Sequence, residues 1–214
     1  GVAALLKSAH PSWSTAAIKS AIMTTADTTN HANNGPILDE TLLPASIFAI
    51  GAGHVNPSRA NDPGLIYDTP FKDYLPYLCG LNYTNREVGN LLQRKVNCSE
   101  VKSIPEGQLN YPSFSITLRV NSQTYTRTVT NVGEAESTYT PELVSPPGVG
   151  VIVKPSTLKF SKMNQKRTYQ VTFSRTANSS TSGVVQGFLK WTSNRHSVRS
   201  PIAVVLEETS TSNV

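Results

Sequence analysis

The stretch FSITLRVNSQTYTRTVT, residues 114–130, alternates apolar and polar side chains. Phe114, Ile116 and Leu118 occupy every second position, which is typical of a β-strand with one buried face. Asn121 and Ser122 interrupt the alternation and predict a turn between two strands. Similar apolar runs recur later in the chain, at residues 149–153, 158–160, 169–173, 189–191 and 202–206. Roughly seven or eight short strands within about 100 residues, without helical periodicity, predict a β-sandwich.

The sandwich predicted for residues 107–214 contains no cysteine. Immunoglobulin domains of antibodies join their two sheets by a disulfide, so the fibronectin type III arrangement fits this part of the chain better. Trp191 alternates with Leu189 in one of the runs, and we expect it in or near the core. The polar tail from Thr209 to Val214 is expected to be frayed.

Residues 1–27, GVAALLKSAHPSWSTAAIKSAIMTTAD, have a helical period instead. The apolar residues of the first helix share one face: Val2, Leu5, Leu6 and Ala9. Pro11 ends this helix, and Ser14 is suited to cap a second one. The second apolar stripe comprises Ala17, Ile18, Ala21, Ile22 and Thr25. The first helix is so apolar that we expect burial on nearly all sides, and therefore a large part of the fold upstream of Gly1.

Several motifs in these regions resemble those of subtilisin-like serine proteases, most closely the plant subtilases. In that family the nucleophile lies in the motif Gly-Thr-Ser-Met-x-x-Pro-His-x-x-Gly-Val-Ala-Ala, and residues 1–4 match its tail. Other matching motifs follow in order: HPSW (10–13), IKSA (18–21), GAGHVNP (51–57), DPGLIYD (62–68), LNYPS (109–113), RTVTNVG (127–133) and RSPI (199–202). The resemblance implies that the catalytic Ser, His and Asp and the oxyanion-hole Asn all precede Gly1. No catalytic residue is therefore expected in this chain.

The resemblance divides the chain into three parts. Residues 1–69 look like the C-terminal end of an α/β subtilisin-like catalytic domain, and residues 107–214 look like a fibronectin type III-like sandwich. Residues 70–106 form a helical linker between them. The linker has two apolar helical faces: Tyr74, Leu75, Tyr77 and Leu78, and then Val88, Leu91 and Leu92. Thr84 is suited to start the second linker helix, with Glu87 three residues later.

Cys79 and Cys98 are the only two cysteines, and they stand near the two ends of this linker. An isolated pair suggests one disulfide, whose loop closure contributes on the order of 3 kcal/mol. The alternative is two free thiols in a reducing compartment. Three glycosylation sequons, at Asn82, Asn97 and Asn178, favour the secretory route and hence the disulfide.

Charge is sparse and unevenly distributed along the chain. Only 15% of residues are charged. Residues 1–106 hold 8 Lys and Arg against 9 Asp and Glu, a net of −1, whereas residues 107–214 hold 11 against 5, a net of +6. The simplest interpretation is a solvated basic surface, and the sharper one is a face for acidic polymers such as cell-wall polysaccharide. Scattered basic residues without a known module argue against nucleic acid.

None of the four histidines has a clear catalytic or metal-binding context. His54 with nearby Asp62 invites comparison with a catalytic triad, but a structural histidine whose ring bonds to backbone in a glycine turn is the better interpretation. His10 is expected to cap a helix end, His31 to lie in a loop and His196 in a β-turn. Without helical ligand spacing or an acidic cluster, we expect neither metal nor cofactor.

Two functions remain in competition. The first is the C-terminal portion of a secreted subtilisin-like serine endopeptidase, extracellular and inactive when separated from the upstream catalytic segment. Its partners would be that segment and a peptide or protein substrate, with neither nucleic acid nor membrane. The alternative is a non-catalytic extracellular binding module for protein or acidic polysaccharide. The sequence has no initiator Met, no signal peptide and no membrane-spanning run, so we expect a soluble chain that is truncated or processed at its N-terminus.

Overall fold

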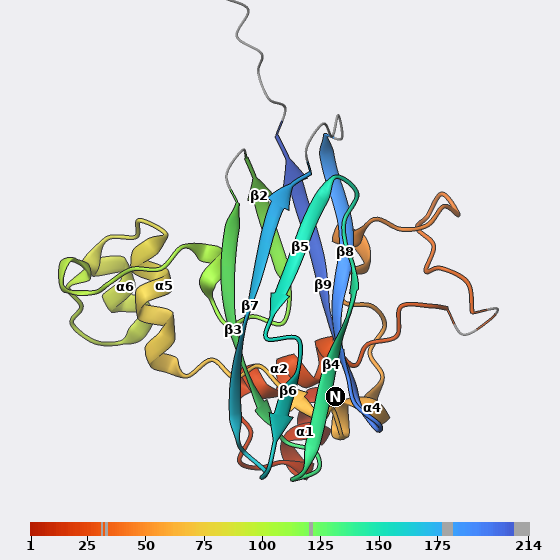
Figure 1. Cartoon of the computed structure of the whole chain (residues 1–214). Helices are drawn as coiled ribbons and strands as arrows, with labels where there is room; N and C mark the ends of the chain where they lie inside the picture. The colour runs from red at the N-terminus through yellow and green to blue at the C-terminus, as the bar shows by residue number, and fades with distance from the viewer. Residues whose placement is uncertain (31, 33, 120–121, 177–181, 208–214) are drawn as a thin grey trace, which may run out of the picture.

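A computed structural model describes residues 1–30, 32, 34–119, 122–176 and 182–207 of the chain. The chain forms a tall β-sandwich with helices α1, α2 and α4 at one end and helices α5 and α6 to one side (Figure 1). His31, the sequon at Asn178 and the predicted tail after Thr209 lie outside the described residues, as does Asn121 of the predicted turn. No helix in the described part of the chain is long and apolar enough to cross a membrane.

The predicted β-sandwich is confirmed and consists of two sheets. In the first the strand order is β1 (Leu65–Ile66), β3 (Gln123–Asn131), β7 (Lys166–Arg175) and β5 (Val149–Lys154). In the second it is β2 (Phe114–Leu118), β9 (Ser197–Leu206), β8 (Gly183–Thr192), β4 (Ser137–Val144) and β6 (Leu158–Phe160). Strands β2 and β9 are parallel, and the other described pairs are antiparallel.

The alternation of the sequence sets which side chains enter the core. In β2, Phe114, Ile116 and Leu118 are buried and the residues between them are exposed, as predicted. Trp191 is fully buried, and its ring lies 5.1 Å from the ring of Tyr169 on the facing sheet. Strand β4 escaped prediction because only Tyr139 along it is buried, so its sequence STYTPELV shows no clear apolar period.

Helices α1 (Val2–Ala9) and α2 (Thr15–Thr24) form as expected, and the Ser14 hydroxyl caps α2 by accepting from the Ala17 N–H at 3.0 Å. The expected burial of α1 on nearly all sides is wrong for the described structure. Leu6 alone is buried, against Ile18 of α2 and Ala60 of α4 (Pro57–Asn61), whereas Leu5 is 67% exposed. Among the described elements, α2 and α4 make the main contacts with α1.

Residues 70–106, the predicted linker, contain the 3-10 turn η1 (Phe71–Asp73), helices α5 (Tyr74–Gly80) and α6 (Asn85–Leu92) and the 3-10 turn η2 (Cys98–Glu100), and the 3-10 turn η3 (Glu106–Gln108) begins at their end. Thr84 and Glu87 form a reciprocal capping box at the start of α6, which explains why that helix begins there. Val88 and Leu92 are buried as predicted, but the prediction for Leu91 is wrong because it faces solvent. A disulfide joins Cys79 to Cys98. Helix α3 (Ile47–Ile50) lies in the long connection before α4.

Replacing Trp191 by Ala should lower the free energy of unfolding by about 3–5 kcal/mol, because it leaves a large cavity between the sheets. Urea unfolding of the whole chain gives this difference. The matched control is Val184→Ala on the same strand, where the side chain is 51% exposed and a change within about 0.5 kcal/mol is expected. Equal unfolding midpoints for Trp191→Ala and the unmodified protein would contradict the core assignment.

Candidate functional site

The sequence motifs meet at the junction between the N-terminal helices and the lower end of the sandwich in Figure 1. Here α2 contacts both β1 and β9. The junction is built from four groups of polar contacts, around Asp27, Tyr67, Asn110 and His196, and each involves residues far apart in the sequence.

Asp27 fixes the glycine turn that contains His54. The backbones of the two residues exchange N–H···O bonds of 2.8 Å, and Gly53 is required beside them because a Cβ there would lie 2.2 Å from the Asp27 carbonyl oxygen. The Asp27 carboxylate accepts from Asn56 Nδ2 at 3.0 Å and from Arg59 Nη1 at 2.8 Å. Asn56 also caps α4. His54 is thus held through its backbone, and its side chain is exposed. In the described structure the expected bond from its ring to the backbone is not seen.

Tyr67 carries the chain from the helices into the core of the sandwich. Its N–H donates to Ser20 Oγ of α2 at 2.9 Å, and its hydroxyl lies 2.6 Å from the Tyr169 hydroxyl and 3.1 Å from Ser200 Oγ. The two residues before it form β1 and pair with Asn131 and Thr130 of β3. Burial raises the pKa of Tyr67, and it raises the pKa of Tyr169 well above its ordinary value.

Amide side chains cover the edge of β3 next to this strand. Asn110 Nδ2 donates to the Asp68 carbonyl at 2.9 Å and to the Thr128 carbonyl at 2.8 Å, and its Oδ1 accepts from the Thr128 N–H. Gln108 makes the equivalent pair of bonds to Thr124 O and Thr126 N. These two side chains therefore satisfy backbone groups that would otherwise be open to another strand.

Arg127 is a buried cation on β3, 2% exposed and facing the core. Its guanidinium donates to the carbonyl oxygens of Tyr111, Ser113 and Thr126 and lies 4.5 Å from the centre of the Phe114 ring. Burial lowers the pKa of Arg127, while neighbouring tyrosines act in the opposite direction. Its contacts with Tyr111 and Ser113 tie the LNYPS motif to the RTVTNVG motif.

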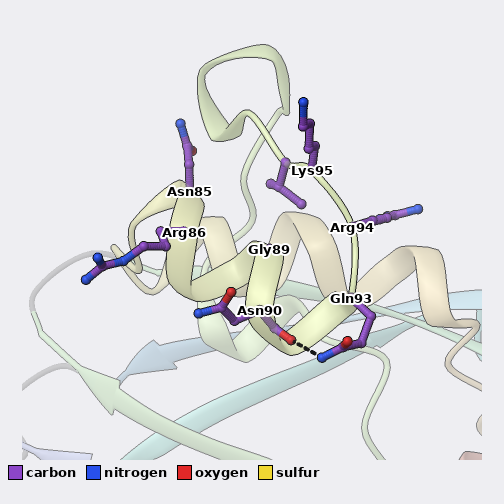
Figure 2. Close-up of a pocket in the computed structure, with 8 residues that line it drawn as sticks. Asn85, Arg86, Gly89, Asn90, Gln93, Arg94 and Lys95 are labelled. Atoms are coloured by element: carbon purple, nitrogen blue, oxygen red, sulfur yellow. Dashed lines mark hydrogen bonds between the residues drawn. The ribbon is translucent and has the colours of Figure 1, made fainter.

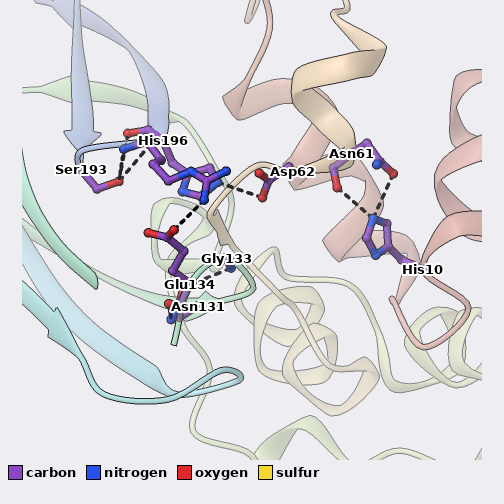
Figure 3. Close-up of polar contacts among 9 residues, drawn as sticks. His10, Asn61, Asp62, Asn131, Gly133, Glu134, Ser193 and His196 are labelled. Atoms are coloured by element: carbon purple, nitrogen blue, oxygen red, sulfur yellow. Dashed lines mark hydrogen bonds and ion pairs between the residues drawn. The ribbon is translucent and has the colours of Figure 1, made fainter. Parts of the chain in front are cut away.

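His196 lies in the hairpin turn between β8 and β9 and is 8% exposed (Figure 3). Its Nε2 is 2.8 Å from Asp62 Oδ1, although the ring N–H is poorly aligned with that oxygen. The ring packs on Gly64 and Gly133, where added Cβ atoms would approach it to 2.6 and 2.9 Å. A second ion pair beside it joins Arg195 to Glu134 at 2.7 Å, and the hydrogen bond from Glu134 raises the pKa of Arg195.

Ser193, His196 and Asp62 lie in one cluster, but their contacts hold the β8–β9 turn in place and do not form a proton relay. Ser193 Oγ accepts from the backbone N–H of His196 at 3.0 Å, so the hydroxyl does not face the ring. In the described structure no serine hydroxyl bonds to a histidine ring, which a Ser-His-Asp proton relay requires. Within the same residues, no group of three or more His, Cys, Asp or Glu could hold a metal ion.

Comparisons with known proteins agree with the motifs that meet here. The family model for the fibronectin type-III domain matches residues 108–204. Subtilisin-like protease SBT1.7 of Arabidopsis thaliana is 44% identical over 207 residues, 95% of this chain and 27% of the relative. Subtilisin-like protease Glyma18g48580 of Glycine max is 44% identical over 95% of this chain and 26% of the relative. Over about 95% of its length, this chain is similar to plant subtilisin-like proteases and fits a C-terminal fragment of one.

The chain spans about a quarter of the length of the subtilisin-like proteases it matches. Among solved structures, a FixG-related protein from Vibrio parahaemolyticus has a TM-score of 0.35 at 13% identity, covering 41% of this chain and 80% of that chain. That likeness is too weak to support an argument about fold or function.

The remaining residues singled out from the sequence are His10, Asp62 and the two described sequon residues. His10 ends α1 as predicted, and its ring stacks on Trp13 at 3.9 Å and lies 2.9 Å from the Asn61 carbonyl oxygen. Asp62 contacts His196 and not His54. The sequon residues Asn82 and Asn97 are both exposed. His196 lies in a turn as predicted, but reasoning from sequence missed its contact with Asp62 and the roles of Asn110 and Arg127. The arginine at an inward-facing strand position was a usable signal.

The buried tyrosine pair predicts a loss of stability at alkaline pH. Because the pKa values are raised in the folded state, the folded chain keeps protons that the unfolded chain loses near pH 10. Stability is therefore fully present below about pH 10 and falls as pH rises further. Urea unfolding between about pH 8 and 11 should show a shallower fall for Tyr169→Phe than for the unmodified chain. Exposed Tyr83→Phe is the control and should keep the original slope; parallel profiles for all three would contradict the assignment.

Proposed function

We propose that the chain is the C-terminal part of a secreted serine endopeptidase that hydrolyses peptide bonds through a Ser-His-Asp triad. The observation that carries this proposal is the 38–44% identity to subtilisin-like proteases over about 95% of the chain. The triad lies in the portion of those proteases that this chain does not cover. Residues 1–4 match the tail of the family's nucleophile motif, so α1 continues the segment that bears the serine.

Exposed apolar side chains support an α/β catalytic domain that extends beyond residues 1–69. They gather in the first part of the chain: Leu5, Leu38, Leu42, Leu43, Phe48 and Val55. Six large apolar side chains exposed within residues 5–55 support a contact with protein outside the described residues. The proposed occupant is the rest of the catalytic domain, which packs on α1 and on the connection around α3.

The proposed role of the sandwich, residues 107–214, is to brace the helix that follows the nucleophile. Ser14 Oγ donates to Asp68 Oδ1 at 2.5 Å, and Ser20 Oγ accepts from Tyr67 N, so the start and the middle of α2 are tied to the two residues that follow β1. Helix α2 in turn packs on α1 through Ile18 and Leu6. Because a displaced nucleophile is costly in rate, a rigid support for α1 matters without touching substrate. The linker, residues 70–106, connects the two parts.

A fluorophosphonate probe tests where the reactive serine lies. We expect the full-length protease to be labelled at a serine outside this chain, and residues 1–214 alone to remain unlabelled and inactive, because no serine here bonds to a histidine ring in the described structure. Stoichiometric labelling within residues 1–214, with peptidase activity, would overturn this assignment. An unreactive full-length protein would favour the non-catalytic binding module instead.

Peptide mapping tests the proposed secretory route. The disulfide between Cys79 and Cys98 and the exposure of Asn82 and Asn97 support it. Protein from its native host, digested without reduction, should yield a Cys79–Cys98 linked peptide and glycan on at least one of Asn82, Asn97 and Asn178. Two alkylatable thiols together with bare sequons would contradict secretion.

A further inference from the structure

We propose that a cationic groove on α6 binds carboxylate-bearing oligosaccharides of the polyuronate type. The groove lies between α6 and the segment that follows it, residues 93–96 (Figure 2). It is shallow and widely open to solvent, with a volume of about 540 Å³. That volume is within the usual range for ligand sites, about 300–1,000 Å³. This binding is separate from the proposed peptidase activity and does not depend on it.

The groove is held in shape by the backbone on both of its sides. Gly89 lets the following segment approach α6 closely: the Arg94 N–H donates to the Gly89 carbonyl at 3.1 Å, and a Cβ at Gly89 would lie 2.9 Å from the Arg94 carbonyl oxygen. Gln93 makes the turn with a φ of 53° and donates to the Asn90 carbonyl at 2.7 Å. Asn85 Oδ1 accepts from the Cys98 N–H at 2.8 Å, which ties the start of α6 to the disulfide.

Positive charge stands around the rim of this groove. Arg86, Arg94 and Lys95 lie at separate points of it in Figure 2, and none of the described lining residues is acidic. The nearby carboxylates accept hydrogen bonds from other residues, Glu87 from Thr84 and Glu100 from Asn97, although Glu87 also attracts the neighbouring Arg86. The hydrogen bonds from Thr84 hold the pKa of Glu87 below its ordinary value.

The helix itself does not explain these charges. A cation after the last turn is ordinary, because the C-terminal end of a helix carries partial negative charge. Arg86, however, lies in the first turn, where that field is unfavourable to a cation. In Figure 2 the three side chains point outward in different directions, and Arg94 also lies over the Phe71 ring, 5.7 Å from its centre. A ligand with several negative charges along a chain would contact more than one of these cations, whereas a single small anion would reach one.

The amide side chains that line the groove favour a carbohydrate as the ligand. Asn85, Asn90 and Gln93 line the same groove, and side-chain amides both donate to and accept from hydroxyl groups. The lining residues include no aromatic ring on which a nucleic-acid base could stack. Uronate units present a carboxylate and several hydroxyls each, which matches alternating cations and amides.

The test is titration calorimetry of the chain with a short oligogalacturonate, compared with the same oligomer as its uncharged methyl ester. The groove variant is Arg86→Gln/Arg94→Gln/Lys95→Gln. The matched control is Lys154→Gln/Lys162→Gln/Lys166→Gln, which removes the same charge from exposed positions of the sandwich. All six side chains are exposed, and circular dichroism with thermal unfolding verifies that both variants fold.

We expect the unmodified chain and the control to bind oligogalacturonate alike and to ignore the methyl ester. The groove variant should bind at least about tenfold more weakly. No binding by the unmodified chain overturns the proposal, and so does equal weakening in the control, which would mean unspecific attraction to net charge. Equally tight binding of polyglutamate at the same groove would assign it to an acidic protein partner and overturn the carbohydrate.

Discussion

The rest of the structure depends on the hydroxyl of Tyr67, which is enclosed between Tyr169 and Ser200 inside the sandwich. A buried hydroxyl without a partner costs free energy, so the chain can place Tyr67 in one position only. With that position fixed, Leu65 and Ile66 align beside β3, and the Tyr67 N–H reaches Ser20 of α2. One residue thereby joins the N-terminal helices, through its backbone, to both sheets, through its side chain.

The polar contacts around Tyr67 select one packing of the strands over other packings. This selection matters more than their contribution to the free energy of folding. Arg127 is buried with carbonyl oxygens and an aromatic ring as partners. For a buried charge of this kind, the hydrogen bonds offset much of the free-energy cost of removing the charge from water. Asn110 and Gln108 act in the same sense. Their amides occupy the edge of β3 with fixed geometry, which excludes a shifted strand or a second chain from that edge.

Local patterns predicted most of the fold because they depend on neighbouring residues. Alternation gave the faces of β2 and β3, and capping chemistry gave the starts of α2 and α6. The junction could not be predicted in this way, because its pairs are distant in sequence, as with Asp62 and His196. The predicted burial of α1 on nearly all sides was wrong for a related reason. An apolar helix face indicates that the face is covered, but it does not indicate which residues cover it.

The junction and the groove depend on different contacts within the chain. The junction depends on long-range bonds: Tyr67 bonds to Ser20 of α2 through its backbone and to Tyr169 through its hydroxyl, and the Asn110 amide joins Asp68 to Thr128 of β3. Among the described elements, the main contact of α6 is with α5, and the charged side chains of Arg86, Arg94 and Lys95 point outward in Figure 2. Its shape depends on its own cap, its glycine and the disulfide, so charge around the groove can change while the support of α1 stays intact. Adhesion to a charged polymer and positioning of a catalytic helix are thus physically separable within this one chain.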